Sequence, residues 1–336
     1  MPLFKKGLVL TQHKEPALSG PIIRFVNPKS DGLEIDSRKR SATSEQQAII
    51  EVARLAEIVD ERDGSFLHKM LEKALDRVDI VIADAVDDEP YVSSRLGPLL
   101  SYREEVAMAL ELCRRVGGCG QAGIVTYKLL GDTLTRVPRS IEKIKVTKVW
   151  GGYPATQQAR LRGFPQERKL VVGVGALIHL ARAAARNKVQ TTTFVTVAGN
   201  CVTNPMNLEV SVGMTVMQVL ERCGLSEPPT RIVCGGSMTG LSIIDAEHTM
   251  VTFTTRAILA IRENERDMLY SCIGCGRCVR QCPAGLNPMH IHRMVERGRR
   301  AGIEVYDPQM CTGCGTCSYV CPSKLEVANS VLAARK

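Results

Sequence analysis

Eight of the 13 cysteines in this chain lie in two copies of one spacing, C-x2-C-x2-C-x3-C-P. The eight residues are Cys272, Cys275, Cys278 and Cys282 in the first copy, then Cys311, Cys314, Cys317 and Cys321 in the second. Thiolates at this spacing bind the irons of a [4Fe–4S] cluster. The pattern therefore predicts two such clusters and a protein that transfers electrons.

The fourth cysteine of each copy has a different role from the first three. Three thiolates two residues apart on a tight loop can reach three irons of one cluster, whereas the fourth, at the start of a helix, crosses to the other cluster. The predicted ligands of the first cluster are Cys272, Cys275, Cys278 and Cys321. The predicted ligands of the second cluster are Cys311, Cys314, Cys317 and Cys282.

Two other uses of these cysteines fit the pattern less well. A zinc site needs four ligands in C-x2-C pairs, usually with a longer gap between the pairs, and has no role for a third cysteine at the same interval. A disulfide framework needs an oxidising compartment, and no apolar signal segment opens the chain.

Composition predicts a cytoplasmic protein of two or three domains. The chain has 336 residues, and its longest apolar stretch, 170–180, is too short to span a membrane. A soluble protein of this kind can also dock on a membrane complex. Five further cysteines lack metal-binding spacing and are predicted to be small buried hydrophobic residues: Cys113, Cys119, Cys201, Cys223 and Cys234.

The net charge of +9 raises the question of nucleic-acid binding. A nucleic-acid module would add a recognisable fold or interleaved aromatic residues, and neither is present. Basic residues cluster within and just after the first cysteine motif: Arg277, Arg280, Arg293, Arg297, Arg299 and Arg300. This cluster favours a docking surface for an acidic redox partner, in which we include Arg277, Arg280, Arg293 and Arg297. The same charges also offset the negative charge of a cluster.

The part of the chain before the cysteine motifs divides into three predicted regions. Residues 1–43 form a small N-terminal β unit, with short β segments at 8–10 and 22–26, and a linker. Residues 44–189 alternate strands with helices, which predicts an α/β domain. Its predicted helices are 45–60, 65–77 and 102–116, its strands are 80–83, 122–127 and 144–149, and 170–187 is a strand that runs into a helix.

Residues 190–263 are predicted to form an α+β domain of β-grasp type. The predicted strands are 191–198, 207–212, 231–234 and 250–253, with a helix at 215–223. Residues 264–336 then form a two-cluster, ferredoxin-like α-helical domain, in which a helix at 288–301 joins the two cysteine motifs. The predicted fold class is therefore multidomain, α/β and α+β.

The order of these parts resembles the C subunit of Rnf-type electron-transport complexes. It is also similar to the cobalamin reductase of propanediol utilisation and the electron-transfer protein of D-proline reductase. The segments that carry the resemblance are Gln12-His13 with Glu15-Pro16-Ala17, Glu89-Pro90-Tyr91, Gly199 to Pro205, Cys234 to Gly240, and the paired cysteine motifs. The resemblance implies an NADH:flavin module for the α/β domain and a soluble-ligand-binding domain for the β-grasp part.

One departure from this family bears on the cofactors. Flavin-binding relatives carry a glycine-rich loop before the Glu-Pro-Tyr segment, where glycines allow the backbone to approach phosphate. Here the loop is 60–68, with Asp60, Glu61 and Asp63, and Asp84 and Asp87 replace two further positions. Carboxylates repel phosphate, so FMN and NAD(H) are not expected to bind.

Other candidate site residues are predicted to be structural. Gly173 and Gly175 form a glycine pair of the kind that usually serves packing or a turn. His290 and His292 lie close to the first motif and are predicted to pack or to face solvent. Met289 and Met294 are predicted to be core residues of the joining helix.

Three functions remain as hypotheses. The leading one is a non-catalytic iron–sulfur subunit that relays electrons between a flavoprotein and a redox enzyme or carrier, such as a ferredoxin, within a complex of different subunits. The first alternative is an NADH-oxidising flavin and iron–sulfur oxidoreductase, against which loop 60–68 argues. The second alternative is a redox- or ligand-sensing interaction module.

Overall fold

The computed structural model describes residues 21–36, 42–127, 137–149, 153–154, 168–262, 270–299 and 301–335. The chain divides into two compact units. The first comprises Met1–Gly236 and Leu241–Arg262, and the second comprises Ser237–Gly240 and Glu263–Lys336. Among the segments above, no helix is long and apolar enough to cross a membrane. The predicted β segment at 8–10 and the family-like residues 12–17 lie outside the described residues.

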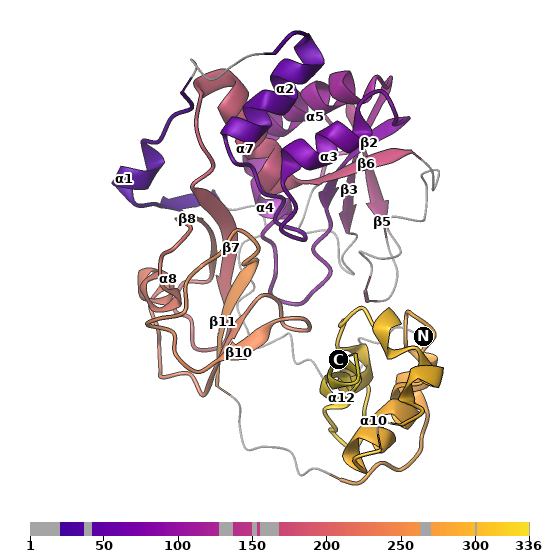
Figure 1. The fold of residues 1–336 in the computed structure, drawn as a ribbon. Helices are drawn as coiled ribbons and strands as arrows, with labels where there is room; N and C mark the ends of the chain where they lie inside the picture. Colours follow the sequence, from indigo (N-terminus) through magenta and orange to yellow (C-terminus); the bar gives the residue numbers. More distant parts are fainter. Residues whose placement is uncertain are drawn as a thin grey trace. The chain divides into compact units, whose positions relative to one another are not determined.

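A five-stranded sheet organises the α/β part of the first unit (Figure 1). Four strands are parallel and β4 is antiparallel to its neighbour β5. Their order is β4 (Ser140–Ile141), β5 (Ile144–Val149), β3 (Gln121–Tyr127), β2 (Ile80–Ala85) and β6 (Lys169–Gly173). The carboxyl ends of β2 and β6 lie side by side, because Asp84 pairs with Gly173. In open α/β sheets this end is where ligands usually bind.

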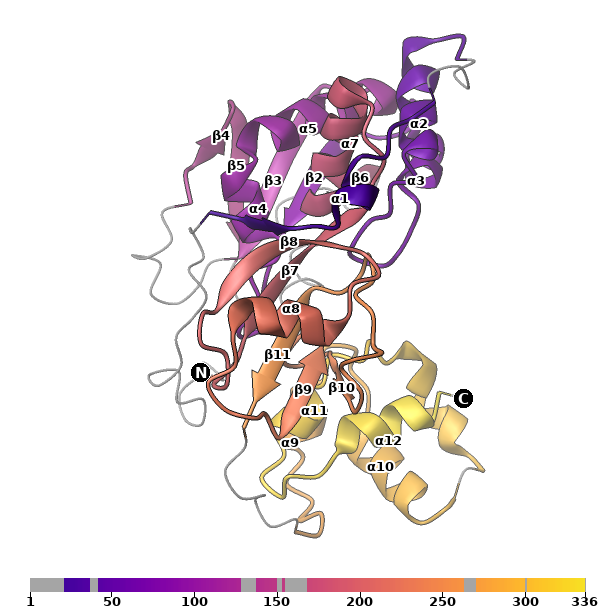
Figure 2. The same cartoon turned by 90° about the vertical axis from the view of Figure 1, so that its left-hand side faces the viewer.

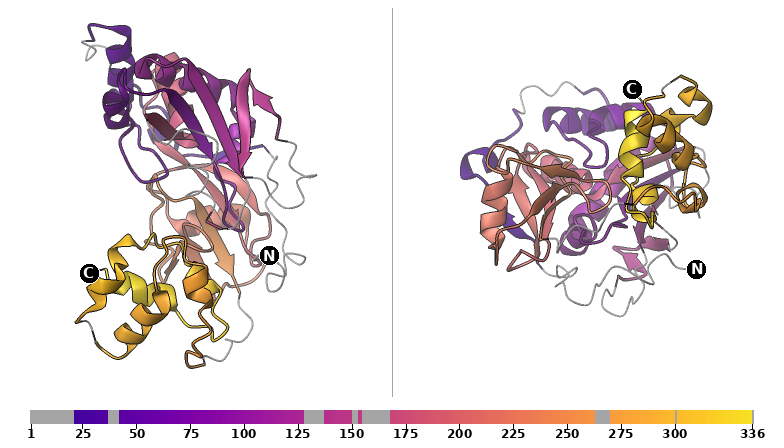
Figure 3. Two further views of the ribbon diagram at one scale, coloured as in Figure 1. Left: turned by 90° about the vertical axis from the view of Figure 1, so that its right-hand side faces the viewer. Right: turned by 90° about the horizontal axis from the view of Figure 1, so that it is seen from below.

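Four helices pack on one face of this sheet, as Figures 1 and 3 show. They are α2 (Glu45–Leu55), α3 (Leu67–Ala74), α5 (Arg103–Gly117) and α7 (Val174–Arg186), and the short α4 (Leu96–Ser101) precedes α5. Alternate strand residues face these helices, because successive side chains of a strand point to opposite faces. The parallel sheet confirms the predicted α/β arrangement.

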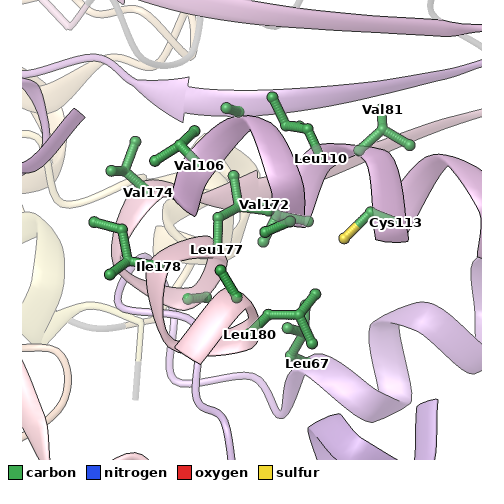
Figure 4. Close-up of a cluster of buried hydrophobic side chains, with 14 of the residues drawn as sticks. Leu67, Val81, Val106, Leu110, Cys113, Val172, Val174, Leu177, Ile178 and Leu180 are labelled. Carbon is green, nitrogen blue, oxygen red and sulfur yellow. The ribbon is translucent and has the colours of Figure 1, made fainter. Parts of the chain in front are cut away.

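The core under these helices is made of interdigitating aliphatic side chains (Figure 4). Val81 and Val172 from the sheet meet Leu110 of α5 and Leu177 of α7, and all four are fully buried. Burying each such side chain stabilises the fold by about 1.5–3 kcal/mol. A smaller cluster that includes Ile82 covers the other face of the sheet.

Two of the predicted helices are shorter than expected. The Ser44 side chain caps α2 by accepting a hydrogen bond from the Gln47 backbone N–H. The Gln47 side chain, however, accepts from Thr43 rather than closing the capping box. The helix ends at Leu55 instead of residue 60, since the chain turns at Glu57, whose φ is +52°. The following helix runs only from Leu67 to Ala74.

The second sheet of the first unit has six strands in the order β1-β8-β7-β11-β9-β10. Their bounds are β1 (Ile23–Phe25), β8 (Met206–Ser211), β7 (Thr192–Ala198), β11 (Ala257–Ile261), β9 (Arg231–Cys234) and β10 (Leu241–Ile243). Helix α8 (Val216–Cys223) lies across one face of the sheet (Figure 2) and begins with a complete capping box between Thr215 and Gln218. Parallel pairing of β7 with β11 places two distant segments side by side.

The structure differs from three predictions for this region. The short strand predicted near residues 22–26 does not belong to a separate N-terminal unit, because β1 pairs in parallel with β8. The helix α1 (Pro28–Asp31) also lies within the predicted linker. No strand forms at 250–253, where Met250 makes only an isolated bridge to Thr215. The hydrophobic residues there close the core instead, and Val251 is buried in the same cluster as the apolar face of α8.

The second unit contains two copies of one arrangement, a cysteine loop followed by a short helix and a longer helix. A cysteine loop leads into the short helix α9 (Arg277–Arg280) and then into α10 (Pro288–Glu296). The second loop leads in the same way into α11 (Thr316–Tyr319) and α12 (Val327–Ala333), after the short 3-10 helices η2 (Ile303–Tyr306) and η3 (Pro308–Met310). Helix α10 ends at Glu296, before the predicted end at 301, since Gly298 has φ +65°. The helices share a small core that includes Leu286, Ile291 and Val331.

Candidate iron–sulfur sites

Two glycines shape the first cysteine loop. Gly274 and Gly276 have φ values of +70° and +69°, the left-handed region that side chains with a Cβ rarely adopt. These turns allow three cysteines to lie on one short loop: Cys272 and Cys275 are half-buried and Cys278 is buried.

A small cavity beside this loop is lined by cysteines from both motifs. Cys272, Cys275 and Cys278 line it together with Cys321 of the second motif. Burial raises the pKa of the Cys278 thiol, and the nearby Cys275 and Cys321 raise it further. Four sulfur atoms around one cavity are a donor set that suits a [4Fe–4S] cluster.

The second cysteine loop has the same backbone. Gly313 and Gly315 take φ values of +70° and +75°, and the Gly313 N–H donates to Cys311 Sγ over 3.4 Å. Burial, together with Cys314 and Cys311, raises the pKa of the Cys317 thiol to about 12. A buried thiol of this kind ionises when a metal binds it, because metal ligation deprotonates a coordinating thiol.

The fourth cysteine of the first motif is half-buried and packs against the core of the unit. Cys282 packs against the same hydrophobic core as Cys311, Cys317 and Cys321. Within the described segments, no group of three or more His, Cys, Asp or Glu side chains is arranged to hold a single metal ion.

Histidines of α10 are partnered, as the sequence predicts. His290 stacks on Tyr306 with the ring centroids 5.6 Å apart. His292 is buried, and its Nδ1 lies 2.8 Å from Ser330 Oγ. His292 and Met289 also line the first cysteine cavity, which the sequence did not indicate. Their spacing of three residues places them on one face of α10, and this was the signal that could have found them.

The basic residues of the predicted docking surface lie on α9, on α10 and, for Arg297, directly after α10. Arg277, Arg280 and Arg297 are exposed and Arg293 is half-buried. Arg280 Nη1 donates to the Cys275 carbonyl over 3.1 Å. No ion pair joins any of these four arginines to a carboxylate of the described residues.

The five scattered cysteines fit their predicted structural role. Cys113, Cys119, Cys201 and Cys223 are buried in the first unit, and Cys234 is half-buried. Burial raises the pKa of the Cys113 thiol to about 12, which keeps it protonated and unreactive.

The acidic loop of the α/β domain lies at the carboxyl end of the sheet. Glu61 Oε1 accepts a hydrogen bond from the Gly175 N–H over 2.9 Å, and Oε2 accepts from the Ala176 N–H over 3.1 Å. These are free N–H groups of the first turn of α7, where the helix dipole favours an anion. The carboxylate therefore occupies the position in which a helix N-terminus binds phosphate.

Glycines allow this close approach. A Cβ at Gly173 would overlap the Glu61 carboxylate, and one at Gly175 would lie 3.0 Å from Glu61 Oε2. Asp60 Oδ2 accepts from the Gly173 N–H over 2.9 Å, so the loop contacts the strand end as well. The glycine pair thus makes room for a side chain of the chain itself, which the sequence analysis missed.

Two arginines balance the buried acids of this region. Arg62 Nε donates to Asp60 Oδ1 over 2.8 Å, and Arg62 Nη2 donates to the Val171 carbonyl over 2.7 Å. Arg95, which is 4 % exposed, lies 3.8 Å from Asp84 Oδ1. Asp87 accepts from the backbone N–H groups of Arg95 and Leu96.

The Glu61 carboxyl is enclosed by this network. Burial raises the pKa of the Glu61 carboxyl to about 6, and the neighbouring Asp60 adds to the rise. The carboxyl is therefore ionised at neutral pH and loses its charge in mildly acidic solution.

The family-like Glu-Pro-Tyr segment links the two sheets of the first unit. Glu89 is buried, and its Oε1 accepts from Arg256 Nη2 over 2.6 Å. A few residues further on, Ser93 Oγ donates to Asn207 Oδ1 of β8 over 2.9 Å. The segment therefore has a clear structural role in joining the α/β domain to the six-stranded sheet.

Two family models match the chain and define its class. A 4Fe-4S dicluster domain matches residues 271–325, and an SLBB domain matches residues 194–242. The chain is therefore an iron–sulfur protein that also carries an SLBB domain.

Curated relatives are the C subunits of ion-translocating complexes. The C subunit of the Na(+)-translocating ferredoxin:NAD(+) oxidoreductase complex of Acetobacterium woodii is 26% identical over 87% of this chain and 71% of the relative. The C subunit of the ion-translocating oxidoreductase complex of Rhodobacter capsulatus is 28% identical over 66% of this chain and 46% of the relative. The resemblance to this part of Rnf-type complexes is thereby confirmed, although the chain spans only about half the length of the Rhodobacter protein.

A solved structure shares the fold. The NAD+-reducing [NiFe]-hydrogenase in its H2-reduced state superimposes with a TM-score of 0.51 at 14% identity. The match covers 92% of this chain and 64% of that chain. At this identity the likeness concerns the arrangement of the backbone alone.

Proposed function

We propose that this chain is the iron–sulfur subunit of an oxidoreductase complex and relays electrons through two [4Fe–4S] clusters. The observation that carries the proposal is the cavity in which Cys321 of the second motif joins Cys272, Cys275 and Cys278 of the first. The clusters supply one-electron transfer. The relatives named as C subunits of such complexes support the same role.

The cysteines of the two loops are the proposed ligands. Cys272, Cys275, Cys278 and Cys321 hold the first cluster, and Cys311, Cys314, Cys317 and Cys282 hold the second. Loop glycines orient backbone N–H groups toward sulfur, as at Cys311, and such hydrogen bonds stabilise the negative charge of the site.

The α/β domain serves this relay as a scaffold without a bound flavin nucleotide. Glu61 occupies the anion-binding first turn of α7. The N–H groups of Gly175 and Ala176 already donate to its carboxylate and are not available to a phosphate group. A buried carboxylate would also repel the phosphate. FMN and NAD(H) therefore belong to a partner, and electrons reach this chain from that protein.

The partner is a redox protein with an acidic docking surface. Arg277, Arg280, Arg293 and Arg297, which pair with no carboxylate of the described residues, suit such a surface, since opposite charge speeds encounter. The name of the Acetobacterium complex includes ferredoxin, a class of protein that fits this description. We place the complex in the cytoplasm or on the cytoplasmic side of a membrane assembly.

An anaerobic reduction experiment tests this function. Full-length protein is mixed with NADH alone, and then with NADH and a catalytic amount of an NADH-oxidising flavoprotein, while the iron–sulfur absorption is recorded. A relay bleaches only after the flavoprotein is added. Bleaching by NADH alone contradicts the proposal and supports the NADH-oxidising alternative.

A further inference from the structure

The two cysteine motifs belong to an internal repeat with an offset of 39 residues. Cys272 corresponds to Cys311 and Cys282 to Cys321, and the helices α10 and α12 follow at matching positions. The backbones agree in detail, since Gly274 and Gly313 both have φ +70°. The repeat therefore allows the surroundings of the two loops to be compared residue by residue.

Side chains at matching positions differ in charge. A Cβ at Gly274 would lie 3.4 Å from Arg293 Nη2, whereas a Cβ at Gly313 would lie 3.7 Å from Leu332 Cδ2. Arg293 and Leu332 occupy the same position of the repeat. The first loop thus has a guanidinium where the second has an aliphatic side chain.

Two further positions show the same difference. Arg280 Nη1 lies against the first loop, 3.1 Å from the Cys275 carbonyl oxygen and 3.2 Å from the point that a Cβ at Gly276 would occupy. The counterpart of Arg280 in the second repeat is Tyr319. Arg277 corresponds to Thr316. Two arginines, Arg280 and Arg293, therefore lie against the first loop, and the second repeat has no cation at any of the three matching positions.

Other groups near the loops do not cancel this asymmetry. Lys324 and Glu326 follow Cys321, are both exposed, and offset each other. At the second loop, Thr316 Oγ1 lies 3.3 Å from Cys314 Sγ and provides a neutral hydrogen bond. The buried His292 lines the first cavity, while Val331 holds the matching position of the repeat. A neutral hydroxyl group stabilises added negative charge less than the two guanidinium groups of Arg280 and Arg293 do.

Positive charge near a cluster stabilises the reduced form, because reduction adds one negative charge. We propose that a cluster held by Cys272, Cys275, Cys278 and Cys321 would have the higher reduction potential and would hold the electron when the protein carries only one. In that internal step one electron would pass from the cluster held by Cys311, Cys314, Cys317 and Cys282 to the cluster held by the first ligand set, with no proton or further reactant. The inference rests on the proposed function and gives the relay a direction.

Redox titration of the anaerobic full-length protein with dithionite, followed by electron paramagnetic resonance, measures both potentials. Arg293→Leu and Arg280→Tyr, which introduce the residues of the second repeat, should each lower the higher potential and leave the lower one unchanged. Leu332→Arg should raise the lower potential. Arg299→Leu removes a cation from the exposed segment after α10 and is the matched control, with both potentials unchanged.

The three charge variants together keep the proposal falsifiable. Leu332→Arg adds a charge at the other loop, so it tests the idea even if Arg293→Leu fails to assemble its clusters. Equal potentials in the unmodified protein would overturn the proposal, as would a fall in the lower potential in Arg293→Leu. Absence of iron and sulfide from the unmodified protein would instead reject the proposed function itself.

Discussion

At the scale of single residues, Glu61 occupies the N-terminus of α7. Its carboxylate accepts two N–H groups of the first turn of α7, which a phosphate would otherwise use. The hydrogen-bond acceptor for this helix terminus is therefore built into the chain.

The raised pKa of Glu61 predicts a pH-dependent stability. The pKa of Glu61 is about 6 in the folded protein, above the ordinary value of 4.5. The stability that the protonated Glu61 carboxyl contributes to the fold is therefore fully present below about pH 4.5 and is lost as the pH rises through 6. The unfolding free energy of the wild type minus that of Glu61→Gln should fall by about 2 kcal/mol between about pH 4 and 7.5. Urea unfolding followed by circular dichroism measures the difference, in which the contribution of the clusters cancels. A difference that does not change with pH would contradict the burial of an ionisable Glu61.

Cys282 tests the crossing of ligands between the two motifs. Serine binds iron less well than thiolate, so Cys282→Ser should lose or weaken the second cluster while the first keeps its signal. Separate electron paramagnetic resonance signals of the two clusters report this, with Cys275→Ser as the control that affects the first cluster. Loss of the first cluster in Cys282→Ser would show that the ligands do not cross.

At the scale of elements, the turn between β6 and α7 depends on glycine because of one side chain. Gly173 has φ −67°, which alanine also adopts, and the Glu61 carboxylate stands where a Cβ would lie. Gly173→Ala should therefore destabilise the protein by about 1–3 kcal/mol. In a Glu61→Ala background the same substitution should cost almost nothing, because the overlap is gone. Additive losses in the double mutant, measured by urea unfolding, would disprove the coupling.

Glu209 joins three elements through charge and hydrogen bonds. Its side chain, on β8, is buried and accepts from Arg182 of α7 over 2.7 Å, from Thr192 of β7 over 2.9 Å and from Arg24 of β1 over 3.2 Å. Burial alone would raise the pKa of Glu209, but the Arg182 guanidinium, with smaller contributions from other cations, outweighs it and the pKa falls to about 2.

Loss of this carboxylate takes the nearest anion away from the buried Arg182 guanidinium and leaves it only the longer contact with Glu105, at 3.8 Å. Glu209→Gln should lower the unfolding free energy by about 3–5 kcal/mol at neutral pH. The depressed pKa means that the stabilisation is present above about pH 4.5 and is lost as the pH falls toward 2. The urea midpoints of the wild type and of Glu209→Gln should therefore differ at neutral pH and converge as the pH falls. A constant gap would contradict the ionised state of Glu209.

Local signals predicted most elements but not their long-range partners. The cysteine spacing predicted both cluster loops, because all three loop ligands of each lie within seven residues of one another. Strands such as Ile80–Ala85 were predicted from short apolar runs. The pairing of β1 with β8 and the contact of Glu61 with Gly175, 114 residues away, depend on tertiary packing that no local pattern encodes. The strand predicted at 250–253 failed for the same reason, since its apolar residues serve a core rather than a sheet.

At the scale of the whole molecule, two compact units divide the proposed tasks. The second unit holds the two cysteine loops, and the first holds two sheets and the anion-binding turn of α7 that Glu61 fills. A relay of this kind requires a partner that supplies flavin chemistry. We propose that the chain carries two clusters and no flavin of its own.

The most direct test is the iron, acid-labile sulfide and flavin content of protein purified without air. Absorption spectra are recorded before and after NADH. About eight irons and eight sulfides per chain, no flavin and no bleaching by NADH are expected, since each [4Fe–4S] cluster holds four of each. One bound flavin that NADH reduces would contradict the account and make the chain an oxidoreductase in its own right.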